Sequence, residues 1–493
     1  MRYSGILMHI SSLPNKYGIG TLGKESYEFV DFLNRAGQKY WQILPLGPTS
    51  YGDSPYQSFS AFSGNPYFID YDLLREDGLL IYDDYKDYDY RENKVNYEWL
   101  YHVRFKILEK AFSRFNVNNE DYKNFKEKEK EWIDDYALFM AIKCHEKEGN
   151  WLSWKSEFRN RDKSALSLFI LENEKEVEFW KFVQYEFFIQ WFRLKKYAND
   201  LGIEIIGDMP IYVAFDSSDV WSNPKYWQLD ESLKPIDVAG CPPDAFTPDG
   251  QLWGNPLYNY DLMEKDGFKW WIKRIKASLT LFDVVRIDHF RGFEAYFAIP
   301  YKDQNARRGH WVKGPNMKLF NKVKEALGDC KIIAEDLGFL TKEVYIMLKE
   351  CGYPGMEVLE FGFDPNDDSD YAPHNHKKNA VVYTGTHDNL PLGGWIDSLD
   401  KENLDYVKEY LSISSNANKD EIIDKLIATC LSSVSLTAIV PMVDYLHLGS
   451  EGRFNTPSTL GDFNWTWRID ASSINDHLAS HIRKLTEIYR RLK

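Results

Sequence analysis

The sequence has few cysteines, no excess of positive charge and no long apolar run. Its 493 residues include only five cysteines, scattered and without a C-x-x-C pair, which argues against a disulfide framework and favours a reducing, cytoplasmic compartment. Asp and Glu number 75 against 60 for Lys and Arg, so neither a nucleic acid nor an anionic membrane is an expected partner. No run of about 18 apolar residues is present, so no membrane-spanning helix is expected. The first residues, MRYSGILMHISSLP, lack the apolar core of a signal peptide.

Hydrophobic residues make up 44% of the chain, which is enough for a large core. Much of this content lies in short apolar runs that are continuous rather than alternating, as expected for parallel strands covered on both faces. Helical patterns separate the runs, and this alternation predicts an α/β fold, a (β/α)8 TIM barrel. The eight predicted strands span residues 5–10, 40–46, 203–210, 282–289, 331–336, 358–363, 380–387 and 437–445.

Uneven spacing of the strands predicts large helical and loop insertions in a single catalytic barrel spanning residues 1–493. Strong helical patterns cover residues 25–36, 129–147 and 182–199. The predicted insertions are 71–180, a mainly helical subdomain after strand two; 215–281, after strand three, with a Gly- and Pro-rich segment at 239–258; and 389–436, helices after strand seven.

Carboxylates stand at the ends of the predicted strands, on the side where a TIM barrel carries its active site. They are Asp208 at the end of strand three, Asp288 at the end of strand four, Glu335 at the end of strand five and Asp388 directly after strand seven. A single carboxylate of this kind is more often an ion-pair partner or a helix cap, and Asp336 is expected to be structural. Four carboxylates at the same end of the barrel, however, predict a shared pocket.

The residues around two of these carboxylates indicate different chemical roles. Strand alternation places Arg286 on the same side as Asp288, where a guanidinium would hold that carboxyl ionised and suited to a nucleophile. Glu335 follows the apolar run 332–334, and desolvation would raise its pKa, which suits a general acid. Carboxyls about 5–5.5 Å apart would favour retention through a covalent intermediate. Asp388 could hydrogen-bond the sugar at the cleaved unit.

Long motifs along nearly the whole chain resemble the amylomaltases, which are 4-α-glucanotransferases, also called disproportionating enzymes, related to the α-amylase group. Because the motifs are long, the resemblance is specific. The motifs are SGILMHISSLPNKYGIGTLG, YWQILPLGPTSYGDSPYQSFSAFSGNPYFID, IIGDMPIYVAFDSSDVW, GCPPDAFTPDGQLWGNPLY, VVRIDHFRGFEAYFAIP, IIAEDLG, YTGTHDN and GRFNTPST.

The resemblance implies roles for individual residues and an activity without metal or other cofactor. Asp288 matches the nucleophile, Glu335 the acid/base and Asp388 the transition-state stabiliser. Tyr51 resembles an aromatic residue of a second glucan site. The implied substrates are α-1,4-glucans as donors and glucose or another glucan as acceptor. Residues that match substrate-binding positions are Tyr56, Asp208, Gln251, Trp253, Arg286, His289, His387 and Asn455, with Gln251 and Trp253 on a lid.

Transfer rather than hydrolysis requires that water be kept from the glycosyl–enzyme while an acceptor is held in attack geometry. The segment 239–258 mixes Gly, Pro and aromatic residues, which is typical of a shaped, mobile loop. We expect this lid, with Phe246 and Trp253, to exclude water.

Three alternatives remain at this stage. A retaining α-glucan hydrolase on the same barrel would convert maltotriose to shorter products alone, whereas a transferase also makes longer ones. A metal-dependent barrel hydrolase would use ligands such as His9, but the sequence has no H-x-H on strand one and no H-E-x-x-H. Its other candidate ligands are Asp208, His289, His387 and Asp388. A glycan-binding protein without turnover is disfavoured by the complete set of carboxylates.

Overall fold

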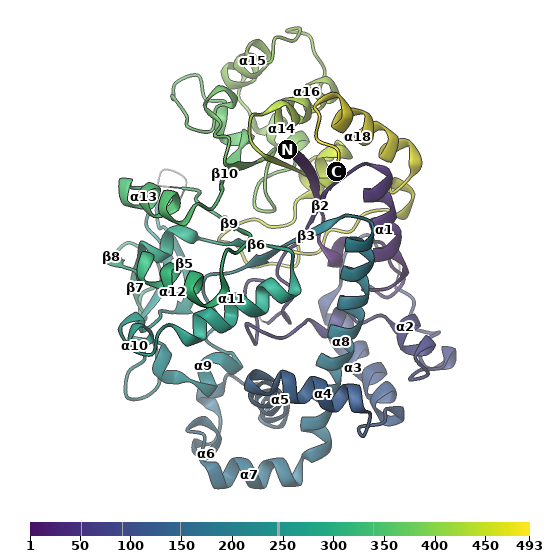
Figure 1. Cartoon of the computed structure of the whole chain (residues 1–493), viewed down its shortest axis with the longest axis vertical. Helices are drawn as coiled ribbons and strands as arrows, with labels where there is room; N and C mark the ends of the chain where they lie inside the picture. Colours follow the sequence, from purple (N-terminus) through teal and green to yellow (C-terminus); the bar gives the residue numbers. More distant parts are fainter. Residues whose placement is uncertain (51, 91, 148, 244–246, 339) are drawn as a thin grey trace.

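Eight parallel strands form the central sheet of this computed structural model (Figure 1), which describes residues 1–493 except 51, 91, 148, 244–246 and 339. The strands pair in the order β10–β11–β12–β1–β2–β3–β6–β9. Their bounds are β1 Tyr3–Leu7, β2 Tyr40–Gln42, β3 Glu204–Met209, β6 Val284–Ile287, β9 Ile332–Ala334, β10 Gly355–Val358, β11 Ala380–Tyr383 and β12 Thr437–Pro441.

The two ends of this sheet meet. The Ala334 N–H at the end of β9 donates to the carbonyl of Pro354, just before β10, at 2.9 Å. The sheet therefore curls into a barrel, and the predicted (β/α)8 fold is confirmed.

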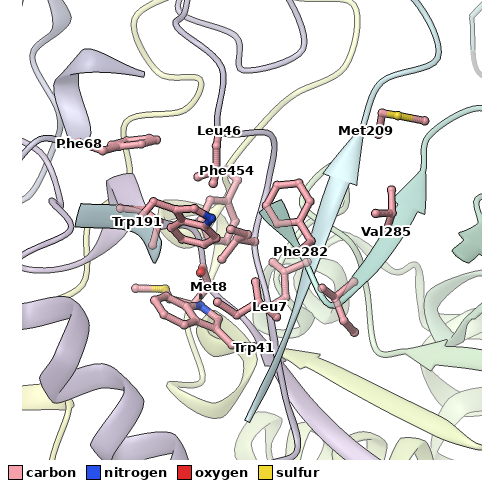
Figure 2. Packing of buried hydrophobic residues seen from close by; sticks show 14 of the residues in the cluster. Leu7, Met8, Trp41, Leu46, Phe68, Trp191, Met209, Phe282, Val285 and Phe454 are labelled. Carbon is pink, nitrogen blue, oxygen red and sulfur yellow. Dashed lines mark hydrogen bonds between the residues drawn. The ribbon is translucent and has the colours of Figure 1, made fainter. Parts of the chain in front are cut away.

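Large side chains fill the space between strands and helices because most strand residues are apolar and buried. Figure 2 shows Trp41 from β2 beside Leu7 and Met8, and its indole N–H donates to the Met8 carbonyl at 2.8 Å. Trp191, from helix α8 (Glu174–Asp200), packs edge-on against Phe282 with ring centroids 6.1 Å apart. The interior is thus closely packed beneath the carboxyl ends of the strands.

The helices predicted most strongly from the sequence are present with slightly different ends. Residues 25–36 correspond to α1 (Lys24–Arg35), followed by Gly37 in the left-handed region at φ 70°. Residues 129–147 correspond to α5 (Lys130–His145), and residues 182–199 lie within α8. Other helices after the strands are α11 Lys269–Leu281, α12 Met317–Leu327, α13 Lys342–Cys351 and α18 Asp476–Ile488.

Long connections between the strands carry additional elements. Helices α3 to α7 gather beside the barrel at the lower end of Figure 1. Before β3 lie α2 Tyr71–Glu76, α3 Tyr97–Arg114, α4 Glu120–Lys128, α6 Ser156–Arg159 and α7 Lys163–Glu172. Between β11 and β12 lie α14 Leu392–Ser398, α15 Lys401–Tyr410 and α16 Lys419–Ser432. No helix among the described residues has the length and apolarity needed to cross a membrane.

A second, antiparallel sheet is formed by strands that are not part of the barrel. It has the strand order β5–β4–β7–β8. Between β3 and β6 the chain also forms α9 (Ser218–Ser222) and α10 (Tyr260–Lys265). The sheet strands are β4 Asp237–Cys241, β5 Gln251–Pro256, β7 Ala295–Pro300 and β8 His310–Lys313.

The predicted position of the sixth strand, residues 358–363, is wrong. The sixth barrel strand is β10, and residues 359–362 form a short 3-10 helix instead. The apolar pattern misled the prediction because β10 contains Gly355 and Glu357, two residue types that are depleted in strands. Glu357 is nevertheless buried, and its carboxylate accepts a hydrogen bond from the Lys377 main chain at 3.4 Å.

Candidate active site

Two carboxylates occupy matching positions on neighbouring strands. Ile287 of β6 is paired in register with Ala334 of β9, so Asp288 and Glu335 are the next residues along their two strands. Neighbouring strands lie about 4.8 Å apart. The main chain holds this register past the strand ends, because the Glu335 N–H donates to the Ile287 carbonyl at 3.0 Å. The two carboxyls interact electrostatically.

A buried guanidinium joins two of the rim carboxylates. Arg286 Nη1 lies 2.6 Å from Asp208 Oδ2, and Nη2 lies 3.1 Å from Asp288 Oδ1. The side chains of Arg286 and Asp208 are almost completely buried, whereas that of Asp288 retains 30% exposure. Arg286 therefore holds one oxygen of Asp288, while the Asp288 side chain stays partly exposed.

The protonation of Asp288 depends on opposing influences. Burial raises its pKa, while Arg286 lowers it; the neighbouring carboxyls of Asp208, Glu335 and Asp388 also raise it. Together these influences raise the pKa of Asp288 well above its usual value, which is opposite to the sequence argument that Arg286 holds Asp288 ionised, because that argument left out burial. The contact with Arg286 is the feature that favours the carboxylate over the acid.

Glu335 is held by main-chain donors. Its Oε2 accepts from the N–H of His289 at 2.6 Å, and its Oε1 accepts from the N–H of Leu337 at 2.7 Å. His289 has φ 52°, in the left-handed region, and this unusual turn directs its N–H toward Glu335. Burial raises the pKa of Glu335, in the predicted direction, and Arg286 and the two main-chain bonds oppose the rise.

Asp388 lies at the more open side of the site, with a side chain 44% exposed. The Asn455 amide donates to its Oδ1 at 2.6 Å, and His387 Nε2 lies 3.4 Å from its Oδ2. Arg453 donates to the main-chain carbonyl of Asp388 at 2.7 Å. Asp388 and Asn455 thus present a fixed pair of polar groups to the cleft.

Three rings form a wall beside these polar groups. Tyr56 stacks on His387 with ring centroids 5.2 Å apart and planes 14° apart, and its hydroxyl donates to Asp208 at 2.7 Å. Trp465 lies 5.7 Å from Tyr56 and 5.9 Å from His387. The sequence argument missed Trp465, which has φ 62° and lies far along the chain in the NWTW segment. Only the aromatic content of that segment could have pointed to it.

Part of the predicted lid contacts the site. Trp253 of β5 lies edge-on to His289 with ring centroids 4.9 Å apart, and its indole N–H donates to Gln251 at 2.9 Å. Burial lowers the pKa of His289 to about 3, so the ring is neutral. Its Nε2 is buried and has no hydrogen-bond partner among the described residues. Tyr51 and Phe246 lie outside the described residues.

The histidines do not form a cluster with metal-ligand geometry. Within the described part of the chain, no group of three or more His, Cys, Asp or Glu side chains could hold a metal ion. His9 instead accepts a hydrogen bond from the Leu44 N–H at 3.2 Å, and burial lowers its pKa to about 3. Its neutral ring therefore contributes to packing and hydrogen bonding.

Carboxylates from several strand ends of this TIM barrel surround a buried guanidinium. This arrangement is typical of barrel enzymes that use a pair of carboxylates to act on glycosidic bonds. A family profile described as 4-alpha-glucanotransferase matches residues 8–473. A 4-alpha-glucanotransferase of Clostridium butyricum is 51% identical over 489 residues, which cover 98% of this chain and all of that protein.

Solved structures agree with this match. The amylomaltase from Streptococcus agalactiae in complex with acarbose superposes with a TM-score of 0.97 at 42% identity, with full coverage of both chains. The amylomaltase from Corynebacterium glutamicum shares the fold, with a TM-score of 0.78 at 20% identity, over all of this chain and 74% of that one. The chain belongs to the 4-alpha-glucanotransferase family, and it is accordingly a glycosyltransferase that acts on α-1,4-glucans.

Proposed function

We propose that this enzyme transfers a segment of an α-1,4-glucan to the 4-hydroxyl of glucose or of another glucan, with retention, through a covalent bond to Asp288. An Asp288 oxygen attacks the anomeric carbon as the bond to the leaving oxygen breaks and Glu335 protonates that oxygen. Glu335 then takes the proton of the acceptor hydroxyl, which displaces Asp288. The observation that carries this proposal is the matched placement of Asp288 and Glu335 on β6 and β9.

The remaining rim residues are proposed to bind the sugar at the cleaved bond. Asp388 and Asn455 offer a carboxylate and an amide to ring hydroxyls, and Tyr56 and His387 offer a flat surface to an apolar sugar face. Arg286 and Asp208 lie beneath them and are proposed to keep Asp288 in place. Such contacts raise the turnover rate only to the extent that they are stronger in the transition state than in the ground state.

The lid is proposed to favour transfer over hydrolysis. Trp253 covers one edge of His289, and Gln251 fixes the indole of Trp253 through its N–H. An aromatic cover at this place excludes water from the glycosyl–enzyme, while a glucan acceptor can displace the lid or bind beneath it. The buried Nε2 of His289, which has no hydrogen-bond partner in the described part of the chain, suits a sugar hydroxyl.

A second glucan site is proposed at a large groove away from the carboxylates. The groove has a volume of about 1150 Å³ and is lined by Ser50, Gly52 and Asp53, which flank Tyr51 in sequence, and by Tyr97 and Tyr101 of α3. Tyrosine rings suit the apolar faces of glucose units. Tyr101 is 47% exposed, so it is open to such a ligand.

We also propose that residues 1–493 form one catalytic unit, in which 71–180, 215–281 with its lid 239–258, and 389–436 are insertions into the barrel. A cytoplasmic location is proposed because no two of the five cysteines are joined in a disulfide among the described residues.

Product analysis on maltotriose tests the proposed function. The wild-type enzyme is expected to give glucose together with longer oligomers, and Asp288→Asn and Glu335→Gln are each expected to lose about a thousandfold or more in turnover. The matched control is Asp283→Asn, which lies at the opposite end of β6 and is expected to keep its activity. Normal turnover in Asp288→Asn would overturn the nucleophile, and products no longer than maltotriose would overturn transfer.

A further inference from the structure

The seam where the barrel closes contains a carboxylate that the catalytic proposal does not use. β9 and β10 are the two ends of the sheet, and they do not share a regular ladder. The main chain crosses the seam through the bond from Ala334 N–H to the Pro354 carbonyl. Two residues further along each segment, the carboxylate of Asp336 accepts from the N–H of Met356 at 2.7 Å. A side chain therefore takes the place that a main-chain carbonyl would have in a ladder.

Asp336 fits this place because the facing strand begins with glycine. A Cβ atom at position 355 would lie 2.3 Å from Asp336 Oδ2, far inside van der Waals contact. The carboxylate occupies the volume that any other residue at 355 would fill. Asp336 and Gly355 are thus mutually dependent, and Asp336 itself is buried.

The same short segment carries Glu335. One oxygen of Glu335 is held by the N–H of His289, at the end of β6, and the other by the N–H of Leu337. Asp336 lies between Glu335 and Leu337 and ties the segment to β10. The acid/base carboxyl is therefore fixed on one side by the β6 turn and on the other side by the seam.

We propose that Asp336 is a positioning residue for Glu335: by closing the seam between β9 and β10, it determines where the carboxyl of Glu335 stands relative to the bound glucan. This inference rests on the acid/base role proposed above for Glu335. Asp336 does not touch the substrate, and it acts through the main chain of residues 335–337 and through its charge.

The charges that face Asp336 define its electrostatic effect. Burial, with smaller contributions from Glu335 and Glu357 of β10, raises its pKa to about 7, while the Met356 N–H and Lys377 act in the opposite direction. Tyr345 of α13 and Tyr371 also interact with it. Once Asp336 ionises, its negative charge disfavours deprotonation of Glu335, so the acid form of Glu335 persists to higher pH.

Two substitutions of Asp336 and two glycosyl-donor substrates, maltotriose and α-maltotriosyl fluoride, test the proposal. Asp336→Ala removes the seam contact, and we expect kcat on maltotriose to fall about tenfold to a hundredfold with KM within about twofold, because a small misplacement of a catalytic group is costly. First-turnover fluoride release from α-maltotriosyl fluoride, whose leaving group needs no protonation, is expected to stay near the wild-type rate. An equal loss with both donors would mean a general structural role and would overturn the proposal.

Asp336→Asn keeps the volume and an oxygen that can accept from Met356, so it folds even if the alanine variant does not. Its charge is lost, and the alkaline limb of the kcat/KM profile is therefore expected to move to lower pH, with little change below about pH 6. The control Asp370→Asn removes an exposed carboxylate from the same neighbourhood and is expected to leave the profile in place. An unchanged profile in Asp336→Asn would count against the proposal.

The Glu335→Gln variant separates this inference from the function on which it depends. If Glu335→Gln retains full turnover of maltotriose, the acid/base proposal fails. If Glu335→Gln is inactive while Asp336→Ala and Asp336→Asn match the wild type with both donors at every pH, only the positioning role fails.

Discussion

A buried glutamate in helix α8 should make the protein less stable as the pH rises. Glu186 is 3% exposed, and its Oε2 has no hydrogen-bond partner among the described residues. Burial raises its pKa to about 8, with Asp77 acting in the same direction and Arg193 against it. Replacing it by Gln keeps the shape and removes the ionisable group.

The sign and size of the effect follow from proton linkage. The unfolded chain releases this proton near pH 4.3 and the folded chain near pH 8, so stability present at low pH is lost as the pH rises between these values. At pH 7, about 2.7 pH units above the unfolded value, the destabilisation is on the order of 4 kcal/mol, at about 1.4 kcal/mol per pH unit. Glu186→Gln is therefore expected to stabilise the protein by that order at pH 7 and by less than about 1 kcal/mol at pH 5.

Urea unfolding at pH 5 and pH 7 measures this difference. Glu174→Gln, an exposed position on the same helix, is the matched control and should change stability by less than about 1 kcal/mol, equally at both pH values. A Glu186→Gln variant that gained the same stability at both pH values, or lost stability at pH 7, would refute the reasoning.

Three further substitutions test other parts of the structure. Arg491 is buried and donates to five main-chain carbonyls, so Arg491→Ala should cost on the order of 3–5 kcal/mol in urea unfolding, whereas exposed Arg490→Ala should cost less than about 0.5 kcal/mol. Trp253→Ala uncovers His289 and should raise the ratio of hydrolysis to transfer on maltotriose; an unchanged ratio would remove the lid from the account. Tyr101→Ala should weaken binding of long glucans by about tenfold or less and leave maltotriose turnover unchanged, as measured by KM for amylose.

The barrel and its rim could be predicted from the sequence because both depend on local patterns. A continuous apolar run that ends in a carboxylate predicts a buried strand with a polar group at its end. Asp208 is the last residue but one of β3, and Asp288, Glu335 and Asp388 follow β6, β9 and β11. The pairing of Asp288 with Glu335 required one further assumption, that sequential strands are neighbours. That assumption holds for β6 and β9.

Features that depend on contacts between distant segments could not be predicted. At the seam, β10 contains Gly355 and Glu357, although glycine and glutamate are depleted in strands. The reason for Gly355 is visible only in the folded structure, where the Asp336 carboxylate lies against it. Trp465 joins Tyr56 and His387 across long stretches of chain, and no local pattern indicates this. The balance of burial against Arg286 at Asp288 likewise requires the folded surroundings.

The most direct test of the account is to trap the glycosyl–enzyme. Glu335→Gln incubated with an α-maltotriosyl fluoride that lacks its terminal 4-hydroxyl should release fluoride once and retain the sugar, because neither an acceptor end nor a base is then available. Peptide mass mapping should find one maltotriosyl adduct on the peptide that contains Asp288. An adduct on another carboxylate, or fluoride release without any adduct, would contradict the covalent role of Asp288.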